Sequence, residues 1–343
     1  WPYYAEHLWA ATPGNGLAAV LYADSVVKAR VGDGTEVTID QATRYPFDET
    51  VRFTIRTPQA VAFPLHLRVP GWCAAPTVAI NGQPAKLADR PQGYLVLSRT
   101  WQDGDTVTLT LPMTITITRW EDTANGLSVD RGPLTYSLKI GERQERYGGT
   151  DQWPAVELYP TTPWNYGLAL DDADPAASFK VVPASWPADD QPFAPDAAPI
   201  TLKARGRRIP QWQPDYLNLV GLLQDSPART TEPEEELTLI PMGAARLRIT
   251  CFPTVTTGPG GHVWTEPAQP TPATASHMHH GDTIAALSDG VEPRRSRDQR
   301  VPRFTWWDHK GSLEWVQYDV PAPRRLSRAS VYWFADQPDG GCH

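Results

Sequence analysis

The sequence predicts an all-β fold made of antiparallel β-sandwiches in tandem. Apolar side chains recur with period two along several short runs, as Val51, Phe53 and Ile55 do around Arg52. Asn-Gly and Asp-Gly pairs, which favour tight hairpin turns, separate such runs. The 35 prolines imply many loops between short strands, because proline is excluded from helix interiors and central strand positions.

The N-terminal residues predict one short helix. Trp1, Tyr4, Ala5 and Leu8 recur at helical spacing, and the stretch TPGNG that follows ends the pattern. After this stretch the period changes to two. The chain opens without a methionine and in the middle of an element, so we expect its true N-terminus to lie upstream.

A first β-domain is predicted up to about residue 117. Strand-like alternation runs through residues 51–57, 63–70 and 105–117. The turns between strands are predicted at residue pairs that tolerate positive φ, namely Asp33-Gly34, Asn81-Gly82 and Asp103-Gly104.

The chain beyond residue 118 predicts shorter and less regular strands. Residues 164–170 and 200–212 still have the pattern of β-segments. Residues 236–253 predict a hairpin of good strand formers, and the pattern leaves open whether this hairpin belongs to a second sandwich or returns to complete the first.

The C-terminal third predicts a linker and a further β-domain. Residues 255–273 are rich in Gly, Pro, Thr and Ala and contain little to bury. Residues 274–343 predict the opening strands of a third β-domain, and we expect the rest of that domain to lie beyond the C-terminus.

Charge and composition exclude several classes of partner. The net charge is −8, and no stripe of Lys and Arg is present, which argues against nucleic acid and anionic membranes. No run of about 18 apolar residues is present to span a bilayer. The three cysteines show no CxxC spacing, so neither a zinc knuckle nor a dense disulfide framework is expected.

Few residue types point to catalysis. Cys73 follows a Pro-Gly-Trp bend, and no general base or basic cluster lies nearby in sequence, so a packed thiol is the favoured interpretation. His277, His279 and His280 supply enough imidazole for a metal, although an exposed loop is the favoured interpretation. The carboxylates lie in turns or in the run 234–236, which is typical of solvated surface.

The tryptophans near the C-terminus give the one binding candidate. Trp315 alternates within a strand-like run and is predicted to lie in a core. One of the adjacent Trp306 and Trp307 must point away from the core if that stretch is extended. We therefore take Trp306 and Trp307 as candidate carbohydrate-binding residues that stack on a sugar ring.

Several motifs stand in a specific order along residues 1–255. LWAATPGNGLAAVLYADS is followed by FPLHLRVPGWC and VAING, and later by DRGPLTYSLKI, WNYGL and LIPMGAARLRITCFP. This ordered combination closely resembles glycoside hydrolase family 127, the β-L-arabinofuranosidase-like proteins once grouped as domain of unknown function 1680.

The resemblance implies an N-terminal (α/α)6 barrel followed by two β-sandwiches, one inserted into the other. It assigns the hairpin at 236–254 to the first sandwich. The implied domains are the last barrel helix (1–16), a first sandwich (17–117 plus 236–254), an inserted second sandwich (118–235), a linker (255–273) and a partial galactose-binding or discoidin-like β-domain (274–343).

The family's chemistry, as the resemblance implies it, is retaining removal of terminal β-L-arabinofuranosyl units. A zinc-bound cysteine thiolate is the nucleophile, and a glutamate is the general acid/base. None of Cys73, Cys251 and Cys342 matches the family's catalytic cysteines. We therefore assign no catalytic residue, metal ligand or cofactor to this chain and expect the zinc in a barrel upstream of Trp1.

Three functions remain open at this point. The first is the non-catalytic C-terminal part of a glycosidase, with its own barrel and an arabinose-containing plant oligo- or polysaccharide as partners. The second is a stand-alone carbohydrate-binding β-sandwich protein. The third is a structural role in which the sandwiches buttress the barrel and hold a homodimer. A secreted or periplasmic location is expected by analogy with a polysaccharide substrate.

Overall fold

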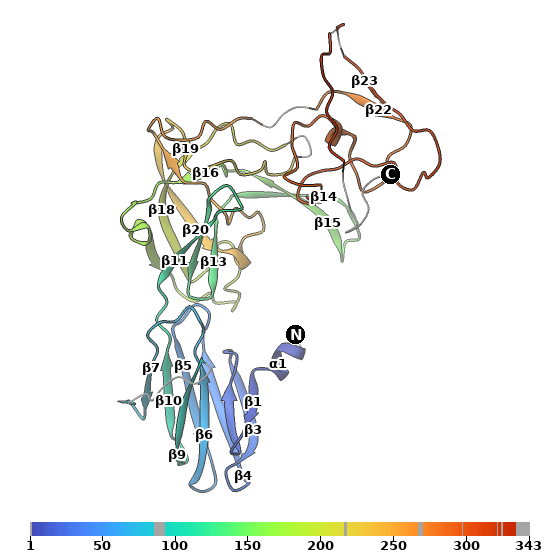
Figure 1. Ribbon diagram of the computed structural model, residues 1–343. Coiled ribbons are helices and arrows are strands. Elements are labelled where there is room, and N and C mark those ends of the chain that lie inside the picture. Colours follow the sequence, from blue (N-terminus) through green and yellow to red (C-terminus); the bar gives the residue numbers. More distant parts are fainter. Residues whose placement is uncertain are drawn as a thin grey trace.

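The computed structural model describes residues 2–85, 93–215, 218–266, 270–296, 298–320, 322–323 and 325–333. Figure 1 shows two β-units stacked end to end, with the C-terminal region beside the second unit. The described part is nearly all β-structure, with a single α-helix, α1 (Pro2–Glu6). The predicted fold class is confirmed.

The first two strands form a hairpin that the sequence interpretation missed. β1 (Trp9–Thr12) pairs antiparallel with β2 (Gly16–Ala19). Gly14 and Asn15 adopt positive φ and reverse the chain between them. The prediction of a helix over residues 1–16 is therefore wrong beyond α1, because the turn that was interpreted as a helix stop joins two strands.

Two sheets pack face to face in the first unit, which we call the first sandwich. Their further strands are β3 (Ser25–Val31), β4 (Thr35–Thr43), β5 (Thr50–Arg56), β6 (Val61–Arg68), β7 (Thr77–Ile80), β8 (Gln83–Pro84), β9 (Tyr94–Trp101) and β10 (Thr106–Thr110). One sheet has the order β1-β2-β6-β9, and the other has the order β3-β4-β5-β10-β7-β8. β2 runs parallel to β6, and the other neighbouring pairs are antiparallel.

The inward side chains of both sheets form one apolar core. β5 buries Phe53 and Ile55 and exposes Arg52, as the period-two pattern predicts. Leu65 from the facing sheet packs into the same core. Cys73 also lies in it, which confirms the prediction of a packed thiol at a strand end.

The Asn81-Gly82 pair forms the tight turn that the sequence predicts between β7 and β8. Asn81 has φ 49° and Gly82 has φ 77°, the pattern of a type I′ turn. The Asn81 side chain also ties the turn to β10: its Nδ2 donates to Asp105 Oδ1 (2.7 Å), and its Oδ1 accepts from the backbone N–H of Thr106 (2.8 Å).

We expect Asn81→Ala to lower the free energy of unfolding by about 2 kcal/mol, because two hydrogen bonds are lost and alanine is strained at positive φ. Urea unfolding measures the change. The control Gln83→Ala, at an exposed position next to the turn, should change the value by less than about 0.5 kcal/mol. Equal values for the two variants would contradict the role of Asn81.

The second unit is built on one seven-stranded sheet, whose order is β11-β12-β13-β20-β18-β16 with β17 paired to β18. Tyr136 and Leu202 lie in its apolar core. The strands of this sheet are β11 (Ile115–Trp120), β12 (Gly126–Arg131), β13 (Leu134–Leu138), β16 (Tyr166–Leu168), β17 (Lys180–Pro183), β18 (Ile200–Arg208) and β20 (Glu234–Pro241).

Two smaller sheets accompany it. β14 (Glu142–Gly149) and β15 (Pro154–Pro160) form a hairpin that projects from the second unit in Figure 1. β19 (Ala228–Arg229) and β21 (Val255–Thr256) form a short parallel pair. β21 lies inside the predicted linker 255–273, so the start of that segment belongs to the second unit.

Residues 236–254 lie in the second unit, and the predicted return to the first sandwich is wrong. β20 pairs with β13 on one side and with β18 on the other. Farther along, Phe252 exchanges two backbone hydrogen bonds with Leu127. Leu239 and Phe252 are fully buried in the second core. The backbone hydrogen-bonding groups of this segment are therefore paired with strands of the second unit, and its apolar side chains are buried in the core of that unit.

The border between the two units lies earlier than predicted. β10 ends at Thr110, and β11 pairs with β12. Residues 115–117 therefore belong to the second unit rather than the first. Apolar and polar residues alternate on both sides of this border, because both units have strands there. The period-two pattern therefore does not show where the first unit ends.

The C-terminal region contains a two-stranded sheet of β22 (Ala273–Ala275) and β23 (Val316–Tyr318) and the short 3-10 helix η4 (Ile284–Leu287). Trp315, which precedes β23, is 50% exposed, so its predicted place in a core is wrong. The neighbouring strand β22 has only three residues, which is too few to bury a large ring. The discoidin-like assignment of residues 274–343 stays a prediction.

Across the described residues, no helix combines the length and apolar character that a bilayer crossing needs.

Candidate functional site

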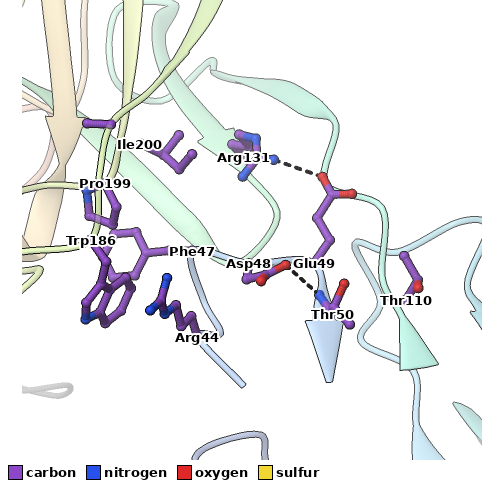
Figure 2. Close-up of a pocket in the computed structure, with 11 residues that line it drawn as sticks. Arg44, Phe47, Asp48, Glu49, Thr50, Thr110, Arg131, Trp186, Pro199 and Ile200 are labelled. Carbon is purple, nitrogen blue, oxygen red and sulfur yellow. Dashed lines mark hydrogen bonds and ion pairs between the residues drawn. The ribbon is translucent and has the colours of Figure 1, made fainter. Parts of the chain in front are cut away.

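A cavity of about 390 Å³ lies at the junction of the two β-units; we call it the junction pocket. The segment between β4 and β5, the end of β10 and the end of β12 contribute to it, as does the loop that precedes β18. Figure 2 shows its side chains converging from both units. The lining residues are Arg44, Phe47, Asp48, Glu49, Thr50, Thr110, Arg131, Ala184, Trp186, Pro199 and Ile200.

The segment between β4 and β5 is held as a tight turn. The carbonyl of Arg44 accepts hydrogen bonds from the backbone N–H groups of Phe47 (2.9 Å) and Asp48 (3.2 Å). The Asp48 carboxylate in turn accepts from the backbone N–H of Thr50 (3.0 Å), a local bond typical of turn-forming aspartates. This turn fixes the direction in which Arg44, Phe47 and Glu49 leave the first sandwich.

An ion pair joins the two units on one side of the pocket. Arg131 Nη2 lies 2.8 Å from Glu49 Oε1, and the same oxygen accepts from the backbone N–H of Met113 (3.0 Å). The Arg131 side chain is 10% exposed and the Glu49 side chain 35%. Arg131 Nε is buried without a hydrogen-bond partner among the described residues, so Glu49 compensates the guanidinium incompletely.

Aromatic rings and a second arginine form the other side. Phe47 is buried and packs edge-on against Trp186, with ring centroids 5.9 Å apart. The guanidinium carbon of Arg44 lies 4.9 Å from the centroid of the Trp186 ring, a cation–π contact. Within the described part of the chain, Arg44 has no ion-pair partner.

The pocket has the chemistry of a binding site rather than a reaction centre. Glu49 is paired with Arg131, and Asp48 is engaged by its own turn. No serine, cysteine or histidine lines the cavity. The groups that remain toward solvent are the Trp186 ring, the Arg44 guanidinium and the Asp48 carboxylate, a combination that suits a polar ligand with an apolar face.

The predicted sugar-stacking residues lie apart from this pocket, in the C-terminal region. Trp306 packs edge-on against Phe304, with centroids 5.1 Å apart, whereas Trp307 is 56% exposed. Lys310 Nζ lies 5.0 Å from the centroid of the Trp307 ring. The two adjacent rings therefore have different surroundings, and Trp307 is the accessible one.

The histidines that the sequence suggested for a metal are not gathered around one point. His277 stacks on His309 at 3.7 Å, and His279 packs against His280 at 4.2 Å. Searched over the described ranges, no group of three or more His, Cys, Asp or Glu side chains is arranged to hold a metal ion. The residues described do not fit a zinc site.

A hydrogen-bonded carboxylate stands beside these histidines. Glu314 accepts from Ser276, from Ser312 (2.7 Å) and from His309 Nδ1 (2.9 Å). These hydrogen bonds stabilise the charged form and lower the pKa of Glu314 to about 2. Glu314 is therefore ionised at neutral pH and acts as a local structural acceptor.

Two of the three cysteines, Cys73 and Cys251, lie among the described residues. Cys73 is packed in the first core, and burial raises the pKa of Cys251, which disfavours the thiolate. Cys342 lies outside the described residues.

Sequence reasoning missed the junction pocket. Arg44, Arg131 and Trp186 lie in three loops or strand ends that are far apart in the chain. Trp186 in a proline-rich loop was the one local signal, because a large ring outside any strand pattern needs a packing partner. Nothing in the sequence indicates that its partners are Phe47 and Arg44.

Comparisons with known proteins point to one family. The family described as β-L-arabinofuranosidase, GH127 middle domain, matches residues 16–113. No protein in the curated comparison matches the chain.

Several solved structures resemble the chain, among them two GH127 β-arabinofuranosidases. One is Ara127N-Se, a GH127 β-L-arabinofuranosidase from Geobacillus stearothermophilus T6, with 25% identity and a TM-score of 0.49 over 73% of this chain and 35% of that chain. The other is a GH127 β-arabinofuranosidase with 20% identity and a TM-score of 0.48 over 71% and 35%. The chain thus spans about a third of the length of these structures.

Proposed function

We propose, on the premise that residues 16–113 are a middle domain of glycoside hydrolase family 127, that this chain is the ancillary, non-catalytic part of a glycosidase. Its parent enzyme removes terminal β-L-arabinofuranosyl residues from plant glycans. The first sandwich and the unit stacked on it support the catalytic domain of that enzyme.

The match to the middle domain carries the proposal. The matched residues cover the first sandwich from β2 at Gly16 to the end of β10 at Thr110 and leave out β1 (Trp9–Thr12). Cys73 lies in the apolar core of the first sandwich and is 3% exposed, a position typical of a packed thiol.

A chromogenic β-L-arabinofuranoside tests the proposal. The chain by itself should release no product, with or without added zinc. The product of the same coding sequence extended upstream should release L-arabinose and should lose that activity with a zinc chelator. Zinc-dependent turnover by the chain itself would contradict the non-catalytic role, and an inactive extended protein would contradict the enzyme class.

A second candidate function is a carbohydrate-binding protein that acts without a catalytic partner. The exposed ring of Trp307 favours it, because a flat aromatic face open to solvent can pack on the C–H groups of a sugar.

On this alternative, Trp307→Ala should weaken binding of the chain to arabinan about tenfold, corresponding to roughly 1.4 kcal/mol. Isothermal titration calorimetry measures the change. The matched control is Trp153→Ala, which removes a ring that is even more exposed than that of Trp307, at the tip of the β14–β15 hairpin, and should leave the affinity unchanged. If unmodified chain releases no heat with any plant polysaccharide, this alternative is excluded.

A further inference from the structure

We propose that the junction pocket binds a sugar acid, with the carboxylate held by Arg44 and the sugar ring packed against Trp186. The inference goes beyond the proposed function, because it concerns a separate site and is argued from the residues of that site alone.

The distribution of charge favours an anionic ligand. The pocket is lined by two arginines and two acidic residues, but the four charges are not equally available. Glu49 is bound to Arg131 and to the backbone N–H of Met113, and Asp48 accepts from Thr50. Arg44 is exposed and has no ion-pair partner in the described part of the chain. Asp48 is also exposed and has no ion-pair partner in the described part of the chain. Arg44 and Asp48 are therefore the two charges open to a ligand, and Arg44 is the one that can bind an anion.

Arg131 adds to the positive field on the opposite side. Its side chain is nine-tenths buried and its Nε lacks a partner among the described residues. Nη2 is paired with Glu49 and Nη1 contacts Met113 Sδ (3.4 Å), so Nε is the N–H group of this guanidinium that remains to be satisfied. A ligand that brings negative charge into the pocket is stabilised by both guanidinium groups.

The aromatic wall favours a ligand that is more than a simple anion. Phe47 and Phe193 pack against one another at 4.9 Å, and Phe47 supports the edge of Trp186. Trp186 is further anchored by its Nε1, which donates to Asp190 Oδ1 (2.6 Å). The indole is thus a rigid surface, and the Arg44 guanidinium lies over one of its faces, 4.9 Å from the ring centroid. An inorganic anion makes no use of this surface, whereas a sugar ring does.

The size of the pocket agrees with this ligand class. A volume of about 390 Å³ lies in the range of small-molecule sites. Figure 2 shows Arg44, Phe47 and Trp186 clustered on one side and the Arg131–Glu49 pair on the other. A hexuronate can therefore place its carboxylate at Arg44 and its ring against the indole, with hydroxyl groups toward the Arg131 side.

Three ligands separate the possible outcomes: D-glucuronate, D-glucose as the neutral sugar of the same ring, and acetate as a carboxylate without a ring. We expect calorimetry to show glucuronate binding at least about tenfold more tightly than either of the others, because a charge-assisted hydrogen bond and ring packing both contribute. Arg44→Gln should reduce glucuronate binding to the level of glucose. Trp186→Leu should reduce it to the level of acetate.

The control variant is Arg56→Gln, which removes an exposed arginine of β5 outside the pocket and should leave all three affinities unchanged. Equal binding of glucuronate and glucose, equal binding of glucuronate and acetate, or no binding of glucuronate by the unmodified chain would each overturn the proposal. These comparisons need no variant, so a poorly folded mutant does not obscure them. The arabinofuranoside assay above has no bearing on them, so either proposal can fail without the other.

Discussion

Trp101→Ala is expected to lower the free energy of unfolding by about 4 kcal/mol, within the range measured for removal of large buried aromatic side chains. Trp101 ends β9 and is fully buried. Its Nε1 donates to the carbonyl of Phe63 (3.1 Å), and the two rings lie 6.0 Å apart. The alanine variant therefore creates a large cavity and removes a buried hydrogen bond between β9 and β6. Urea or thermal unfolding measures the loss.

The matched control for this change is Trp153→Ala. Trp153 is 74% exposed on the β14–β15 hairpin, so its removal should change the free energy of unfolding by less than about 0.5 kcal/mol. A loss of under about 1 kcal/mol for Trp101→Ala would show that the first core tolerates the cavity and would contradict its close packing.

Glu49→Ala is expected to lower the free energy of unfolding by about 3 kcal/mol and to weaken the junction of the two units. The change leaves Arg131 with no carboxylate while its side chain stays nine-tenths buried, and an unpaired buried charge is costly. The value lies at the lower end of the range for broken buried pairs because Glu49 is itself partly exposed. Calorimetry should show the single transition broadening or separating into two.

Two further variants isolate the ion pair. Glu36→Ala removes half of the exposed Lys28–Glu36 pair and should cost less than about 1 kcal/mol. The double change Glu49→Gln with Arg131→Met removes both charges and should recover part of the stability lost in Glu49→Ala. If Glu49→Ala costs no more than Glu36→Ala, the Arg131–Glu49 pair does not hold the units together.

Most of the first sandwich could be predicted from the sequence. Val51, Phe53 and Ile55 are buried, and Arg52 is exposed, as their alternation indicates, because successive side chains of a strand point to opposite faces. The Asn81-Gly82 turn was predictable for an equally local reason, since few residue pairs accept positive φ at both positions.

The helix predicted over residues 1–16 failed on local conformation, because β1 and β2 form a hairpin there. The other predictions that failed concerned the partners of a segment. Leu237 and Leu239 were correctly placed on a strand, but not in the sheet where that strand pairs. Trp315 has a strand-like pattern around it and is nevertheless half exposed, because its neighbouring strand is short. A pattern of apolar residues shows which face is to be buried and does not show what buries it.

The sequence by itself determined the β-class of the chain, the inward faces of its longer strands and the positions of its tight turns. These properties depend on side-chain hydrophobicity and on the φ values that each residue accepts, both of which act over a few residues. The tertiary structure decided which sheet receives β20, where one unit ends, and that Arg44, Arg131 and Trp186 line one cavity. Those outcomes depend on pairing and packing between separate segments of the chain. Many combinations of segments satisfy the same local pattern, and the complete set of contacts selects one of them.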